Sequence, residues 1–182
     1  LEVNEIGLRA LRSTSGIREI FDQPTPFKLD RRYDVIVATD VLEHIADDKG
    51  AAKWVADRLR PGGVFFSTVP AYQFLFSEHD VALHHFRRYT ATSYSSIMPA
   101  ELEIERCGYF NSVLFPVAAT ARLANRFLSK KKGPGQAEKQ SSIVPSTVDA
   151  VFRSILQMEI AMIDKGLGLP FGLSVYCLAR RL

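Results

Sequence analysis

The stretch Tyr33-Asp-Val-Ile-Val-Ala-Thr-Asp-Val-Leu-Glu-His-Ile45 determines the interpretation of the rest of the chain. Residues 35–38 form a continuous apolar run rich in β-branched side chains. This run predicts a buried strand covered on both faces, as in a parallel sheet between two helix layers. The polarity changes at its carboxyl end, where Asp40, Glu43 and His44 lie within five residues. Because ligands of open α/β sheets bind there, the three side chains are candidate site residues. The alternative is that Asp40 caps a turn and the other two are solvated.

Composition indicates one globular domain, residues 1–182. The chain has 182 residues, 47% of them apolar and 24% charged, and a net charge of +3. These values are typical of a soluble domain with a substantial core, and the charge is too small to indicate nucleic-acid binding. Cys107 and Cys177 show no metal or redox spacing, which favours a reducing compartment and hence the cytoplasm. The most apolar long segment, 113–128, contains charged residues and does not predict a membrane span.

Strand patterns alternate with helix patterns along the chain, which predicts an α/β fold with a mostly parallel sheet. Strands are expected over 1–3, 17–21, 35–38, 64–69, 102–106 and 173–179, and helices over 6–12, 48–59, 91–98, 113–128 and 148–163. Asp47 or Asp48 is expected to cap the helix that follows, Arg60-Pro-Gly-Gly63 to form a turn, and Pro116 to bend its helix. The polar segment near 129–146 predicts a mobile surface linker.

Two motifs together resemble class I S-adenosylmethionine-dependent methyltransferases. Asp40-Val-Leu-Glu-His-Ile45 is followed, about seventeen residues later, by Pro61-Gly-Gly63. The signature is closest to the branch that methylates small molecules. The resemblance implies a Rossmann-like, doubly wound, seven-stranded sheet whose last strand is antiparallel. It also implies methyl transfer from S-adenosylmethionine to a small-molecule acceptor, with oxygen as the expected nucleophile.

The same resemblance implies the cofactor-binding residues. Glu2 occupies the position of the acid that accepts hydrogen bonds from the ribose hydroxyls. Asp22 matches the acid that meets the adenine amino group. Asp40, Val41 and Leu42 match the segment beside the methionine portion and the sulfonium.

The family's first strand and its glycine-rich loop have no counterpart in the chain. We expect them in residues upstream of Leu1, so that the natural protein is longer than this sequence. If the natural protein lacks that loop, the alternative is a non-catalytic methyltransferase-like domain that serves as a binding or assembly module. A third alternative, a nicotinamide-dependent enzyme, is disfavoured by the two motifs.

The catalytic candidates are His44, His85 and Glu43. An oxygen nucleophile must lose its proton, and histidine titrates near neutral pH, so His44 and then His85 are the candidate bases. Glu43 is expected to face the acceptor with them. A competing interpretation makes the same region a metal site, because some related methyltransferases hold a divalent ion with Glu-x-x-Glu-His and a later histidine. Here the ligands would be Asp40, Glu43 and His44, with His79, His84 or His85 as the fourth.

The loop after the strand at 64–69 is the expected acceptor site. Arg87 and Arg88, with Tyr89, are candidates for binding an anionic acceptor, because guanidinium groups match phosphate and carboxylate. The alternative is that one arginine pairs with Glu78 or Asp80 and fixes the loop. Tyr72 suggests a partly apolar acceptor. Lys130 to Lys132 leave a lipid-linked acceptor open, and self-association of the chain also stays open.

Overall fold

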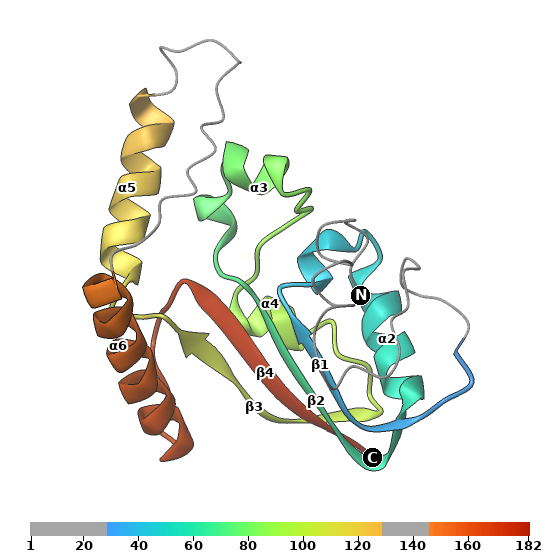
Figure 1. The fold of residues 1–182 in the computed structure, drawn as a ribbon. Helices are drawn as coiled ribbons and strands as arrows, with labels where there is room; N and C mark the ends of the chain where they lie inside the picture. The colour runs from blue at the N-terminus through green and yellow to red at the C-terminus, as the bar shows by residue number, and fades with distance from the viewer. Residues whose placement is uncertain (1–28, 129–145) are drawn as a thin grey trace.

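The computed structural model describes residues 29–128 and 146–182. Its four strands are β1 (Tyr33–Thr39), β2 (Leu59–Pro70), β3 (Leu102–Phe110) and β4 (Ser174–Arg181). They form one sheet in the order β1-β2-β4-β3 (Figure 1). β1 pairs in parallel with β2, whereas β4 pairs antiparallel with both β2 and β3. The last strand is therefore inserted antiparallel between parallel neighbours, and the expected α/β sheet is confirmed.

Helices pack against the sheet and continue beyond one of its ends. The longer helices are α2 (Asp48–Arg58), α5 (Phe115–Leu128) and α6 (Ser146–Asp164); the shorter elements are η1 (Leu42–His44), η2 (Gln73–Leu75), α3 (Glu78–Ala82) and α4 (Ala91–Ser95). Figure 1 shows α2 beside β1 and β2, and α6 beside β3 at the other side of the sheet. None of the helices in the described ranges is long and apolar enough to cross a bilayer.

The core lies on the sheet face covered by α2 and α4. Phe65 and Val69 of β2 and Val175 of β4 are fully buried there. Tyr94 of α4 is also fully buried, and its hydroxyl donates to the Ser67 hydroxyl at 2.8 Å. Alternate residues of β2 thus face the helices, as the period of a strand requires.

The prediction that the strand at 35–38 is covered on both faces is wrong for the described part of the chain. Ala38 belongs to the core, but the side chains of Val35 and Val37 are 58% and 60% exposed. Successive residues of a strand point to opposite faces, and the described helices cover only the face of Ala38.

Several element boundaries differ from those expected. The expected turn at 60–63 lies within β2, where Gly62 has φ +77° and the pairing with β1 is irregular. The backbone accommodates the turn residues as an interruption of the ladder. β3 extends to Phe110, four residues beyond the expected strand end at 106. Pro116 lies in the first turn of α5, where a missing N–H costs no helical hydrogen bond. The strands expected at 1–3 and 17–21, the helix at 6–12 and most of the linker lie outside the described residues.

A buried acid attaches α6 to the end of β3 and the start of α5. The carboxylate of Glu159 accepts hydrogen bonds from the backbone N–H groups of Ser112 and Val113, at 3.1 and 2.9 Å. Arg106 adds a hydrogen bond to the carbonyl of Ile163. These contacts fix the direction of α5, whose Arg122 reaches the candidate site.

Candidate functional site

The polar stretch after β1 folds back under the carboxyl end of the sheet. Asp40 has φ +51°, a left-handed conformation that aspartate tolerates better than most residues, and its N–H donates to the carbonyl of Thr68. The following short helix η1 then places Leu42 and Glu43 in the interior and His44 at the surface. One tight reversal therefore separates an exposed Asp40 from a buried Glu43.

A second segment reaches the same place from beyond β2. α3 begins with a capping box in which Ser77 and Asp80 bond to each other's backbone, and the N–H of His85 donates to the carbonyl of Asp80. The N–H of Phe86 donates to the carbonyl of Glu43 at 2.8 Å. This last bond joins the two segments and places His85 opposite η1.

Glu43, His44 and His85 form one cluster of potential ligand atoms, called here the Glu–His–His cluster. The Nε2 atoms of both histidines lie 4.0 Å from Glu43 Oε1. The imidazole rings meet edge to face, with their centroids 4.5 Å apart. One ligand atom from each of the three residues lies within 4.8 Å of the others. The structure thus brings together all three predicted catalytic residues, although Asp40, His79 and His84 are not part of this cluster.

The Glu43 carboxyl is buried without a hydrogen-bond partner. Its side chain is 0% exposed, and neither oxygen has a partner among the described residues. Its pKa is raised from 4.5 to about 8, chiefly by desolvation; its own backbone N–H opposes the shift, and the nearby charge of Asp40 adds to it. Burial and the neighbouring His85 lower the pKa of His44. Burial therefore favours the neutral forms of Glu43 and His44 near pH 7.

Asp80 is equally buried, but its carboxylate has several hydrogen-bond partners. Its Oδ1 accepts hydrogen bonds from Nδ1–H of His85 at 3.0 Å and from Arg88 Nε at 2.7 Å, and its Oδ2 accepts from the N–H of Ser77. Arg122 lies 3.9 Å from the same carboxylate. Burial acts to raise the pKa of Asp80, but the bonds from Arg88 and His85 outweigh it and lower the pKa to about 2. An ionised Asp80 can only accept hydrogen bonds, so it bonds the Nδ1–H of His85 and leaves Nε2 as the ring nitrogen on the Glu43 side.

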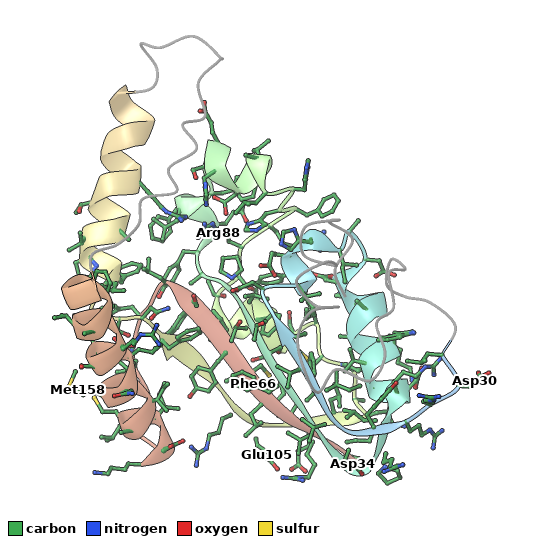
Figure 2. The ribbon with its side chains drawn as sticks, in the orientation of Figure 1. Asp30, Asp34, Phe66, Arg88, Glu105 and Met158 are labelled. Atoms are coloured by element: carbon green, nitrogen blue, oxygen red, sulfur yellow. The ribbon has the colours of Figure 1, made fainter. Side chains whose placement is uncertain are left out.

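Three of the predicted acceptor-binding residues have partners inside the chain. Figure 2 shows Arg88 between α3 and the carboxyl ends of β1 and β2, and its side chain is 4% exposed against Asp80. Arg87 pairs with Asp48 at 2.7 Å, and the hydroxyl of Tyr89 donates to the same carboxylate at 2.8 Å. These contacts correspond to the structural alternative for Arg88 and bury its guanidinium, whereas the side chain of Arg87 stays 31% exposed beside its ion pair.

The remaining predicted site residues lie in three places: an aromatic group, the start of η1, and the part of the chain outside the described residues. Tyr72 lies in an aromatic group, stacked on Tyr109 with centroids 5.3 Å apart and close to Phe74 and Phe115. Its φ of +60° marks a sharp change of direction at the end of β2. Val41 is half-buried and Leu42 is buried at the start of η1. Glu2 and Asp22 lie outside the described residues.

Asp80 is the site residue that the sequence interpretation undervalued. The sequence indicated Asp80 only as an ion-pair partner for an arginine, whereas in the structure Asp80 also orients His85. The signal that would have found it is the spacing Ser77-x-x-Asp80, a capping-box pattern with aspartate in the place of glutamate. Such a box predicts a helix start, and the helix returns the chain to η1.

Comparison with known proteins identifies the family. A family model described as a methyltransferase domain matches residues 7–111, which include the whole Glu–His–His cluster. The chain belongs to this methyltransferase-domain family. No curated protein matches the chain.

A solved structure with a TM-score above 0.5 supports the same fold. An S-adenosylmethionine-dependent methyltransferase from Clostridium acetobutylicum is 13% identical and matches with a TM-score of 0.54 over 99% of this chain and 73% of that one. A phosphoethanolamine N-methyltransferase from Haemonchus contortus, solved with S-adenosyl-L-methionine, is 12% identical, with a TM-score of 0.43 over 82% of this chain and 33% of that one. The chain spans between 33% and 57% of the length of the first three similar structures.

Proposed function

We propose that the chain carries the acceptor side and part of the cofactor site of an S-adenosylmethionine-dependent methyltransferase that acts on a small molecule, at oxygen. The observation that carries the proposal is the Glu–His–His cluster at the carboxyl end of β1, within a methyltransferase-family domain. Two histidines and a neutral acid at this edge suit an acceptor whose hydroxyl must lose a proton. The free cysteines support a cytoplasmic location.

The described residues at the end of β1 fit the cofactor. Thr39 and Asp40 are exposed there, and the Asp40 carboxylate is an acceptor for the ammonium or hydroxyl donors of S-adenosylmethionine. Val41 follows with a half-buried apolar side chain. The cofactor, when bound, supplies an electrophilic methyl group on a sulfonium, and Asp40 lies at the strand end where such ligands bind in open α/β sheets.

The Glu–His–His cluster offers side chains that can take up the proton of the acceptor hydroxyl. The acceptor oxygen gains a bond to the methyl carbon, the carbon–sulfur bond breaks with its electron pair going to sulfur, and the hydroxyl proton must leave. His85 Nε2 presents a lone pair because Asp80 holds the opposite ring nitrogen. His44 lies at the surface beside it and is the second candidate. Glu43, kept neutral by burial, is a potential hydrogen-bond donor to the acceptor oxygen.

The test is calorimetric titration of the intact natural protein with S-adenosylhomocysteine. We expect saturable binding that Asp40→Asn weakens at least about tenfold, since a charge-assisted hydrogen bond is lost. His44→Ala and His85→Ala should leave this affinity unchanged and lower turnover once an acceptor is known. Asp34→Asn, at the opposite end of β1, is the matched control. Absence of binding in the wild-type protein would reject the cofactor assignment and favour a non-catalytic binding module.

A further inference from the structure

The Glu–His–His cluster has the composition of a transition-metal site. It offers two imidazole nitrogens and one carboxylate oxygen from two segments, one centred on η1 and one following α3. Zinc and the neighbouring first-row ions favour this mixture of nitrogen and oxygen, whereas magnesium and calcium favour oxygen alone. Three protein ligands with an open position are also the pattern of catalytic rather than structural zinc sites.

The distances are compatible with closure on one ion. Ligand atoms about 2.0–2.1 Å from a tetrahedral ion lie about 3.3–3.4 Å from one another. The two measured separations from Glu43 Oε1 are 4.0 Å, and the whole set fits within 4.8 Å. Side-chain rotations alone can shorten the separations between ligand atoms by this amount. His44 is half-exposed, so it can turn without disturbing the core.

The buried Glu43 carboxyl is an independent observation that points to a ligand. Buried polar atoms in proteins almost always have partners, and an orphaned one indicates a missing ion or water. Among the described residues, neither oxygen of Glu43 has a hydrogen-bond partner, although His44 and His85 present nitrogen atoms 4.0 Å from Oε1. A cation between these atoms would satisfy the carboxylate and use the lone pairs of both histidines.

Asp80 supplies the outer contact that metal-binding histidines usually have. In such sites the ring nitrogen opposite the metal donates to a carboxylate, which fixes the tautomer and the orientation of the ring. His85 Nδ1–H makes this bond to Asp80 at 3.0 Å, and Arg88 holds Asp80 in place. The free nitrogen of His85 is therefore preset to bind a cation beside Glu43.

We infer that Glu43, His44 and His85 bind one divalent first-row transition-metal ion, with Asp80 as the residue that positions His85. The role of this ion in methyl transfer rests on the proposed function, but its binding does not. An acceptor hydroxyl at the open coordination position would lose its proton to solvent more readily. In that case the histidine nitrogens act as ligands rather than as bases.

Metal binding is measured on the protein after treatment with a chelator. Calorimetric titration with Zn²⁺ should give one ion per chain, Mn²⁺ should bind more weakly than Zn²⁺, and Mg²⁺ at least about a hundredfold more weakly than Zn²⁺. Cobalt loading should produce visible absorption bands. Glu43→Gln, His44→Ala and His85→Ala should each reduce the affinity for Zn²⁺ at least tenfold, and Asp80→Asn about 10–100-fold. His79→Ala, an exposed histidine of α3 outside the cluster, should bind as the wild type does.

The result that overturns the inference is the absence of saturable Zn²⁺ binding, or an affinity that Glu43→Gln and His44→Ala both leave unchanged. Equal affinity for Mg²⁺ also overturns it. His44 is half-exposed, so His44→Ala keeps the test decisive if circular dichroism shows that His85→Ala does not fold. Titration with S-adenosylhomocysteine in the presence of chelator separates the two claims. Cofactor binding without Zn²⁺ binding rejects the metal site alone, and Zn²⁺ binding without cofactor binding rejects the methyltransferase proposal alone.

Discussion

Replacement of Glu43 by glutamine should stabilise the metal-free protein at alkaline pH. The folded state raises the pKa of Glu43 from 4.5 to about 8 because burial disfavours the charged form. A difference of this size corresponds to about 4–5 kcal/mol between the protonated and ionised forms. Glutamine has nearly the same shape as protonated glutamate and carries no charge, so Glu43→Gln removes the cost of ionisation with little change in packing.

The sign follows from the two pKa values. Below pH 4.5 the carboxyl is protonated in both the folded and the unfolded chain, and the variant should match the wild type. Between 4.5 and about 8 the unfolded chain ionises while the folded chain keeps its proton, so the stability of the wild type falls with rising pH. Above about 8 the variant should be more stable by an upper limit of about 4–5 kcal/mol, roughly 8–20 °C in melting temperature.

The assay is urea unfolding followed by circular dichroism at several pH values, with chelator throughout. The quantity compared is the difference in unfolding free energy between wild type and variant, because other titrating groups contribute equally to both. Glu103→Gln, an exposed acid of β3, is the control and should give a difference that does not change with pH. A constant difference for Glu43→Gln as well would refute the reasoning, since it would mean that Glu43 ionises normally in the folded protein.

Two further predictions concern other charged and titrating groups. Asp80→Asn should lower the unfolding free energy by about 3–5 kcal/mol, because it leaves the buried Arg88 unpaired. Asp34→Asn should lower it by at most about 1 kcal/mol, because the ion pair of Asp34 is exposed. Similar losses in the two variants would show that the Asp80 network is not buried. A hydrogen bond from Cys177 lowers the pKa of Cys107 by more than burial raises it. Cys177→Ala should therefore slow the alkylation of Cys107 near pH 7 severalfold. Cys177→Ser keeps a hydrogen-bond donor and should preserve the rate. Mass spectrometry across a pH series measures the rates, and equal rates in the two variants would contradict this role of the hydrogen bond.

Local patterns were sufficient to predict β1 and α2, which flank the site, but not η1 and α3, which carry it. The β-branched run predicts β1, and the helix after Asp47 begins where its side chain accepts the N–H of Gly50. Both signals lie within a few residues of the element that they specify. The position of Glu43 and His44 at the end of β1 follows from chain order alone. The family resemblance added the antiparallel position of the last strand.

Local patterns could not show why His85, already a candidate base, is the loop histidine that reaches the cluster, because this depends on the path of the chain. His79, His84 and His85 are close in sequence, but α3 and the left-handed φ of +60° at His84 direct them differently. Only His85 is turned back toward η1, where the Phe86 N–H meets the Glu43 carbonyl. That bond joins residues far apart in sequence, so no local pattern indicates it. The exposure of Val37 has a similar origin, since a strand pattern does not state which faces are covered.

Glu43 and Asp80 are both inaccessible to solvent, yet their environments are opposite. Asp80 has hydrogen bonds from an arginine, a histidine and a backbone N–H, and it stays ionised as a structural anion. In the described part of the chain no arginine or histidine bonds to Glu43, and burial keeps it protonated at neutral pH, so its ionisation costs stability. An apolar side chain of similar volume would avoid this burden and pack equally well. A purely structural role therefore does not explain Glu43, whereas a ligand that arrives from outside, a cation or the hydroxyl of an acceptor, would provide the missing partner.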